Sequence, residues 1–272
     1  MKKVILFLFL LLAAIGIDYE INSIGLVNLS NENELFLLVA ILLLSIYIIP
    51  ASWLLFRYKN YFAISVYVLS ISLFFGCFIP GWVAAYGNEA AKPIIDSVAH
   101  ESSSLNAWIS ALTAPLVEET VKGACAVGLI YLLKKQRLSE VFFIGVCVGL
   151  GFQILEDISY IVNQAGDSMK EIFPQTLLRI SGAISSHWAY TGLFVLGLFC
   201  LIHKNSGIPA KKGYLWLLSP IGLHFLWNSP LNEWTIGDLS LISAILTAIT
   251  LLLIIQVIQY LAQHEVIHEK SE

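Results

Sequence analysis

Residues 113–128 read TAPLVEETVKGACAVG, a stretch in which Glu118, Glu119 and Lys122 stand among apolar and small side chains. The surrounding chain is strongly apolar, because 58% of its 272 residues are hydrophobic and only 12% are charged. Its mean hydropathy is +0.80. A soluble domain carries about 25% charged residues, and runs of about 20 apolar residues can cross a bilayer as helices. The sequence therefore predicts an all-α, polytopic membrane protein.

Successive apolar runs predict about eight transmembrane helices in one membrane domain. They cover residues 3–18, 35–56, 61–86, 106–133, 139–163, 176–203, 213–229 and 236–262. We expect the first run to be a retained helix rather than a cleaved signal peptide, because no small-x-small site follows it. Eleven of the fifteen Lys and Arg residues then lie on the side of the N-terminus, so both termini are predicted to be cytoplasmic.

The ionisable side chains within the membrane are concentrated in four consecutive spans, between residues 106 and 229. The polar residues of these spans are Glu118, Glu119, Lys122, Glu156, Asp157, Arg179, His187, His224 and Asn228. Four acids and a lysine left unpaired at mid-bilayer would cost about 12–18 kcal/mol, at about 2.5–3.5 kcal/mol each. A domain's whole stability is of that size. We therefore expect these groups to face one another or a water-filled cavity.

Helix geometry predicts that these groups meet in one layer near the bilayer centre. Glu118 lies about 12 residues into its span, which at 1.5 Å per residue is roughly 18 Å. His187 and His224 lie at a similar depth in theirs. Three pairs four residues apart share a helix face: Glu118 with Lys122, Phe152 with Glu156, and His224 with Asn228. We therefore expect Glu118 to pair with Lys122, while Glu119 points about 100° away.

Carboxylates beside imidazoles and an amide are a suitable set for hydrolysis. A desolvated glutamate can take a proton from water, and a His/Asn pair can stabilise an oxyanion. The sequence contains no GxSxG motif, which argues against a serine hydrolase. The HExxH pattern of zincins occurs at 264–268 (HEVIH), in the tail beyond the last predicted span, where His264 and His268 are expected to be solvated. Other classes stay open: a proton- or cation-coupled transporter, a metal-dependent hydrolase using Glu118, His187 and His224, and a non-enzymatic scaffold or immunity protein.

Four short motifs, in order and on consecutive spans, resemble those of a known family. They are EETVK at 118–122, FQILE at 152–156, SSHWAY at 185–190 and HFLWN at 224–228. They are similar to the EExxK, FxxxE, histidine and HxxWN signatures of the PrsW family of bacterial glutamic-type intramembrane proteases, over about residues 110–230. The resemblance places the chain in the wider superfamily of CAAX prenyl proteases and Abi proteins.

The resemblance implies a peptidase of the bacterial plasma membrane. Its substrate would be a single-span, membrane-anchored protein, such as an anti-sigma factor, cut near the extracytoplasmic side. A CAAX- or Abi-like processing protease is the alternative within the superfamily. We expect no cofactor and no metal ion. The net charge of −4 argues against a nucleic-acid partner, so the expected partners are the substrate and the lipid bilayer.

Resemblance and chemistry together suggest roles for these residues, with 106–229 as the catalytic core. Glu118 or Glu119 would activate the water, and Glu118 is favoured because it shares a face with Lys122. Glu156 and His187 would complete the water site, and His224 and Asn228 would stabilise the oxyanion. The supporting residues are Lys122, Asp157 and Phe152. Asp157 has no assigned role, and Arg179 is expected to be an interface anchor or a partner of acids in the outer loops.

Overall fold

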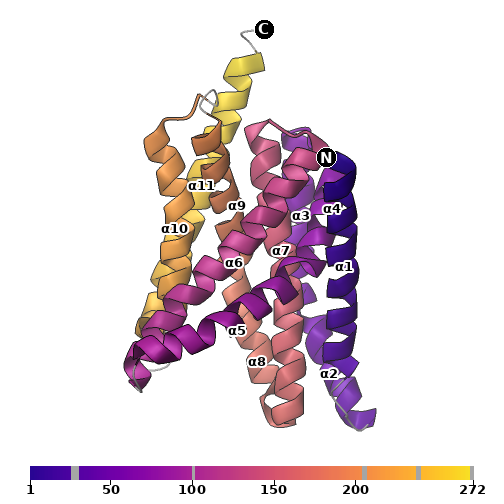
Figure 1. The fold of residues 1–272 in the computed structure, drawn as a ribbon, viewed down its shortest axis with the longest axis vertical. Helices are drawn as coiled ribbons and strands as arrows, with labels where there is room; N and C mark the ends of the chain where they lie inside the picture. Colours follow the sequence, from indigo (N-terminus) through magenta and orange to yellow (C-terminus); the bar gives the residue numbers. More distant parts are fainter. Residues whose placement is uncertain (26–30, 100–101, 204–206, 237–239, 270–272) are drawn as a thin grey trace.

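A computed structural model describes residues 1–25, 31–99, 102–203, 207–236 and 240–269, which form a bundle of helices without a β-strand (Figure 1). The α-helices are α1 (Lys2–Gly25), α2 (Asn31–Leu43), α3 (Ser45–Tyr61), α4 (Val66–Phe78), α5 (Pro80–Ala99), α6 (Ser103–Leu133), α7 (Leu138–Asp167), α8 (Ile172–Gly182), α9 (His187–Ile202), α10 (Ala210–Asn228) and α11 (Leu241–Glu269). Short 3-10 turns are η1 (Met169–Glu171), η2 (Ala183–Ser185) and η4 (Pro230–Glu233). The predicted all-α membrane fold is confirmed.

Six helical segments of the described chain are long and apolar enough to cross a membrane. They are Lys2–Ser23, Asn33–Tyr61, Val66–Ala99, Leu138–Gly166, Met169–Ile202 and Leu241–Glu265. The predicted spans over 106–133 and 213–229 are also helices, α6 and α10. Their acids, lysines, histidine and amide make them less apolar than the other six. The count of eight spans and the cytoplasmic location of both termini stay predictions.

Three of the predicted spans are divided between helices, and the one over 35–56 divides at Leu44 into α2 and α3. The predicted helix over 61–86 ends at Phe78, and α5 begins at Pro80 and runs obliquely beside α6 (Figure 1). Pro80 has no N–H to continue α4 and stands at the first position of α5, where a helix needs none. The predicted helix over 176–203 divides into α8, η2 and α9, because Ser186 takes a non-helical conformation with φ −134° and ψ −146°. His187 therefore begins a helix within the bundle.

Helix α7 lies at the centre of the bundle, packed between α4 and α9. Close approach of α7 and α9 depends on small residues, as in other membrane bundles. At Gly149, a Cβ atom would overlap the carbonyl group of His187. At Gly145, it would press on the backbone of Thr191. The two helices are therefore in backbone contact at the level where α9 begins.

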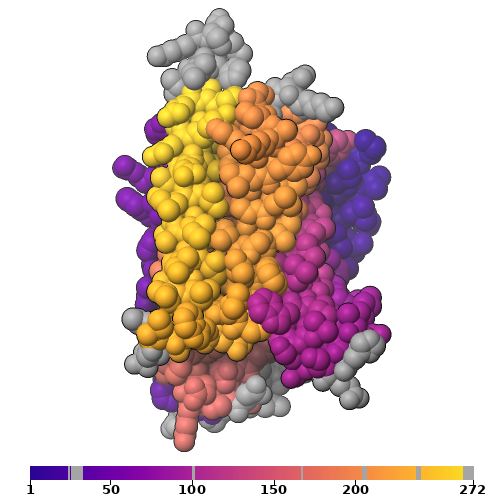
Figure 2. Space-filling model, turned by 90° about the vertical axis from the view of Figure 1, so that its left-hand side faces the viewer, coloured from indigo at the N-terminus to yellow at the C-terminus, as the bar shows by residue number. Residues whose placement is uncertain are grey.

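The remaining helices surround this centre. Helix α10 packs against α9, and α6 crosses in front of α7 and α9 (Figure 1). Helices α1, α3 and α11 lie at the periphery and carry many exposed apolar side chains, such as Phe7, Trp53 and Leu252. Figure 2 shows α11 and α10 side by side on one outer face. The centre of the bundle is thus enclosed by helices whose outer faces suit lipid.

Candidate active site

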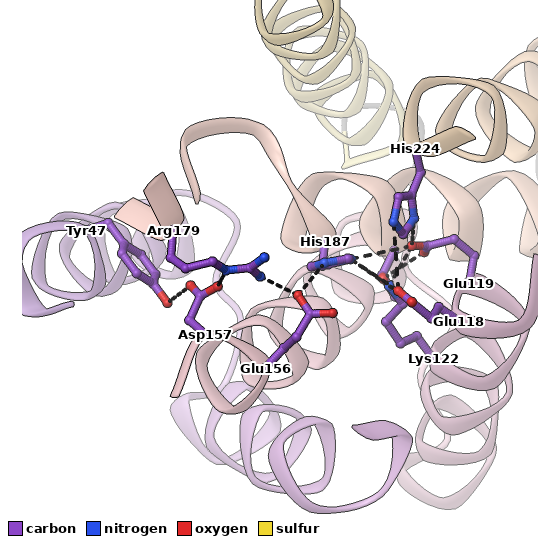
Figure 3. A network of polar contacts seen from close by, with 10 residues as sticks. Tyr47, Glu118, Glu119, Lys122, Glu156, Asp157, Arg179, His187 and His224 are labelled. Carbon is purple, nitrogen blue, oxygen red and sulfur yellow. Dashed lines mark hydrogen bonds and ion pairs between the residues drawn. The ribbon is translucent and has the colours of Figure 1, made fainter. Parts of the chain in front are cut away.

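Helix α6 supplies the first part of a buried polar network (Figure 3). The side chains of Glu119 and Lys122 are fully buried, and that of Glu118 is 10% exposed. Lys122 Nζ lies 2.6 Å from Glu119 Oε1 and 3.6 Å from Glu118 Oε2. The expected ion pair between Glu118 and Lys122 is therefore confirmed, but it is not the closest contact of the lysine. The lysine pairs most closely with the acid three residues before it, a spacing that also brings side chains together on a helix.

Two histidines from α9 and α10 complete this inner part of the network. His187 Nδ1 lies 2.8 Å from Lys122 Nζ. His224 Nδ1 lies 3.3 Å from Glu119 Oε1, and its Nε2 lies 3.8 Å from Glu118 Oε2. The two imidazole rings are 4.9 Å apart between centroids. The prediction that the acids of α6 meet both histidines in one layer is confirmed.

Two neighbours of His187 in the sequence, Tyr190 and Thr191, also belong to the site, and neither was predicted from the sequence. Thr191 Oγ1 donates a hydrogen bond of 3.0 Å to Glu119 Oε2. The Tyr190 ring stacks on His224, with centroids 5.4 Å apart. Thr191 lies four residues after His187 and so shares its helix face. That spacing was the signal that could have identified it.

Glu118 and Glu119 occupy different environments although they are adjacent in sequence. Glu119 accepts from Thr191 and contacts Lys122 and His224. Glu118 Oε2 is buried and has no hydrogen-bond partner among the described residues. Buried polar atoms are nearly always hydrogen-bonded, to protein or to ordered water. Glu118 Oε2 is therefore the oxygen of this pair that is placed to hold a water molecule or a substrate group.

A second group of polar side chains lies beside the first, around α7. Glu156 Oε2 lies 3.1 Å from His187 Nε2 and also accepts from Arg179 Nη2. Arg179 Nε donates to Asp157 Oδ1, and Tyr47 Oη donates to Asp157 Oδ2 at 2.8 Å. The expectation that Arg179 is an interface anchor or pairs with acids in the outer loops was wrong. Its partners are acids within α7, because α8 packs against that helix.

Two further residues of the predicted set have different outcomes. The centroids of the Phe152 and His187 rings are 4.9 Å apart. Lys122 Nζ lies 4.3 Å from the centroid of the Phe152 ring. It therefore supports both the histidine and the lysine. Asn228 is exposed at the last residue of α10, and its side chain makes no hydrogen bond within the described chain. The structure thus leaves Asn228 outside the network.

Fold and site together define a polytopic helical membrane protein with acids, a lysine and imidazoles gathered among its central helices. A family model described as PrsW family intramembrane metalloprotease matches residues 65–263, and the chain belongs to this family. The protein is thus a member of a family of membrane proteases. The match includes α4, α5 and most of α11, beyond the four motifs. No curated protein and no solved structure matches the chain.

The family description raises the question of a metal ion. Glu118, His187 and His224 each offer one possible ligand atom, and these atoms lie within 4.8 Å of one another. However, Lys122 Nζ already lies 2.8 Å from His187 Nδ1 and 3.6 Å from Glu118 Oε2. An ion between these ligands would compete with the ammonium group for the same atoms. Because the Lys122 ammonium contacts two of the three possible ligands, the group of Glu118, His187 and His224 does not fit a metal ion in this arrangement.

Proposed function

We propose that this protein is an intramembrane endopeptidase in which Glu118 activates the attacking water. The observation that carries the proposal is the buried Glu118 Oε2, which has no hydrogen-bond partner among the described residues and has the imidazole nitrogens of His187 and His224 at 3.9 Å and 3.8 Å. A water molecule held there would satisfy this oxygen and lie next to a base. General base catalysis of this kind contributes about 10²–10⁴-fold to a rate.

The proposed reaction follows from these positions. Glu118 takes a proton from water, and the resulting hydroxide attacks the carbonyl carbon of the scissile peptide bond. The proton then passes from Glu118 to the amide nitrogen as the C–N bond breaks, which gives a carboxylic acid and an amine. Peptide hydrolysis by this route consumes one water and needs no other reactant.

His224 is the candidate for stabilising the oxyanion. Its Nδ1 lies 3.3 Å from Glu119 Oε1, and a carboxylate on one imidazole nitrogen fixes the tautomer and orientation of the ring. The Nε2–H group is then free to donate to the oxygen of the tetrahedral intermediate. Asn228 contributes only if the substrate draws the end of α10 inward. Glu119 and Lys122 act by holding this ring and His187 in place.

The substrate proposed is a single-span, membrane-anchored protein, cut near the extracytoplasmic side. Glu156 and Arg179, which are predicted to lie toward that side, are each 21% exposed, whereas Glu119 and Lys122 are 0% exposed. Access of water and peptide from this side would suit a scissile bond near the membrane surface. An anti-sigma factor in a bacterial plasma membrane, and the relation to CAAX and Abi proteins, rest on the resemblance of the motifs.

The test uses the purified full chain in liposomes with single-span membrane proteins, and mass spectrometry maps the new termini. We expect Glu118→Gln to abolish cleavage while the melting temperature stays at or above that of the wild type, because Glu118 Oε2 has no hydrogen bond to lose and Lys122 keeps its closer ion pair with Glu119. The control is Glu89→Gln, in an exposed ion pair with Lys92, which should cleave normally. Full cleavage by Glu118→Gln would contradict the proposal.

Two further measurements separate the alternatives. Cleavage that is lost with a chelator and restored by a divalent metal would retain the protease but overturn the metal-free mechanism. Ion or solute flux into the liposomes without any peptide cleavage would identify a transporter instead. Chelator-insensitive cleavage that depends on Glu118 is the result that we expect.

A further inference from the structure

Arg179 lies on α8, outside the four sequence motifs, and links two adjacent acids of α7 (Figure 3). Its Nη2 donates to Glu156 Oε2, and its Nε donates to Asp157 Oδ1. Glu156 Oε2 also lies 3.1 Å from His187 Nε2. A single carboxylate oxygen therefore joins Arg179 to a histidine of the candidate active site.

We propose that Arg179 is a positioning residue, which acts through Glu156 to hold the His187 ring in the orientation that offers Nδ1 to Lys122. Its kinetic consequence rests on the proposed function, but the arrangement itself can be tested without any substrate. Arg179 does not touch the reacting atoms in this proposal. It determines where the imidazole of His187 lies.

Arg179 is held from several directions. Its guanidinium uses two neighbouring nitrogens for two different acids, a geometry that the planar fork of arginine allows and the single ammonium of lysine does not. Its Cζ lies 4.4 Å from the ring centroid of Tyr160, a cation–π contact. Tyr47 Oη donates to the other oxygen of Asp157 at 2.8 Å. These contacts bring α3, α7 and α8 together around one side chain.

The neighbours of His187 determine which of its nitrogens carries a proton. A lysine ammonium only donates, so His187 Nδ1 accepts from Lys122 Nζ at 2.8 Å. Nε2 then carries the proton and donates to Glu156 Oε2. The hydrogen bond on one imidazole nitrogen sets the role of the other. Loss of the Glu156 acceptor would leave a buried N–H without a partner and free the ring to turn.

The contacts of Glu156 with Arg179 and His187 matter because the helix is broken between these two residues. Residues 183–186 between α8 and α9 are not α-helical, so a continuous ladder of backbone hydrogen bonds does not fix His187 relative to α8. The contacts of Arg179 and His187 with Glu156 tie both helices to α7 instead. A side-chain contact thus replaces the rigidity that an unbroken helix would have supplied.

The direct test observes the Nε2 proton of His187 by NMR in detergent micelles, with ¹⁵N-labelled histidine and assignment by its absence in His187→Gln. We expect a downfield resonance in the wild type, because the proton is hydrogen-bonded to a carboxylate. Arg179→Gln should move it upfield or remove it, as should Glu156→Gln. The control Arg57→Gln, at an exposed position of α3, should leave it unchanged. An unchanged resonance in Arg179→Gln would overturn the proposal.

Kinetics add a second readout. Arg179→Gln should lower kcat about 100-fold with KM unchanged, which is the size of loss expected when a group beside the reacting atoms is misplaced by about 1 Å. Arg179→Lys should stay impaired, because it cannot reach both acids, and added guanidinium should restore part of the activity of Arg179→Ala. Activity that falls only in proportion to the folded fraction would contradict positioning. A shifted resonance in a protein that cleaves nothing would leave the positioning intact and overturn the proposed function.

Discussion

Helices α7 and α11 have nearly the same length, with 30 and 29 residues, and both contain a segment that can cross a membrane. In α7, 89% of the most apolar stretch is buried within the protein, and the hydropathy of that stretch is 1.9. In α11 the buried share is 22% and the hydropathy is 2.7. The less apolar helix is therefore the one at the centre.

The difference shows what decides burial in a bilayer. Lipid tails are as apolar as leucine, so apolarity alone does not draw a helix into a bundle. Small residues such as Gly145 and Gly149 permit close packing, and polar groups such as Glu156 and Asp157 require partners. Helix α11 has neither glycine nor a charged side chain between residues 241 and 263. The following predictions compare changes at the centre with matched changes at the periphery.

The largest effect is expected for Glu119→Gln. It leaves Lys122 without its closest counter-charge at 2.6 Å, and breaking a buried pair costs about 3–5 kcal/mol. Cleavage should fall about 1,000-fold, within the range for loss of catalytic groups. The control Gln256→Leu, on an exposed part of α11, should change neither the stability nor the cleavage rate. The checks are cleavage rate and unfolding in mixed micelles. Wild-type stability of Glu119→Gln would show that the pair is not a structural element.

A large effect is also expected for Gly149→Ala. The added methyl group would overlap the carbonyl of His187, and backbone atoms cannot move aside easily. We expect a loss of about 3 kcal/mol, the upper end for overpacking, together with reduced cleavage. Gly222→Ala is the matched control, because a Cβ there meets nothing within 4 Å. Equal melting temperatures for the two variants would contradict the close contact between α7 and α9.

A smaller effect follows from Ile144→Ala, which leaves a cavity at a fully buried position of α7. The cost should be about 2 kcal/mol, the lower end for such substitutions, because the alternative environment is lipid rather than water. Ile255→Ala on α11, where the side chain is 50% exposed, should be near neutral. Unfolding free energies in micelles measure the difference. Equal losses would mean that α11 is packed against another protein surface.

The smallest effect is expected for Glu265→Gln, at the point where α11 contacts the start of α7. Glu265 Oε2 accepts from Arg137 at 2.8 Å, and its Oε1 accepts from the Ser139 N–H at 3.0 Å. The amide oxygen of glutamine can keep the bond from Ser139, so the substitution removes the charge and the hydrogen bond to Arg137. The loss should be about 0.2–1 kcal/mol, as for partly exposed ion pairs, and should shrink in high salt. A loss that salt leaves unchanged would contradict this explanation.

Much of the centre could be predicted because polar residues in a membrane segment have few permitted places. The cost of isolated charges predicted that Glu118, Glu119, His187 and His224 would meet, and helix spacing gave their common depth. The choice of Glu119 as the closest partner of Lys122 could not be predicted from spacing. Positions three and four residues apart both lie within reach of a lysine, and the distances of 2.6 and 3.6 Å depend on packing.

Other features of the site could not be predicted from the sequence. No proline at residues 183–187 signals the break at Ser186 in the sequence. The break depends on how α8 and α9 each pack against α7. The partners of Arg179 could not be predicted, because a basic residue near a span end usually reaches toward the interface. Asn228 shares a face with His224 in the sequence pattern, yet α10 ends there and leaves its side chain exposed.

The unpartnered oxygen of Glu118 has a practical consequence for future work. A buried carboxyl oxygen that no protein group hydrogen-bonds lowers the stability of the folded protein, and proteins often give up stability for activity in this way. The Glu118→Gln variant should therefore be both inactive and more stable than the wild type. An inactive and stable variant is suited to electron cryomicroscopy of a complex with an uncleaved peptide.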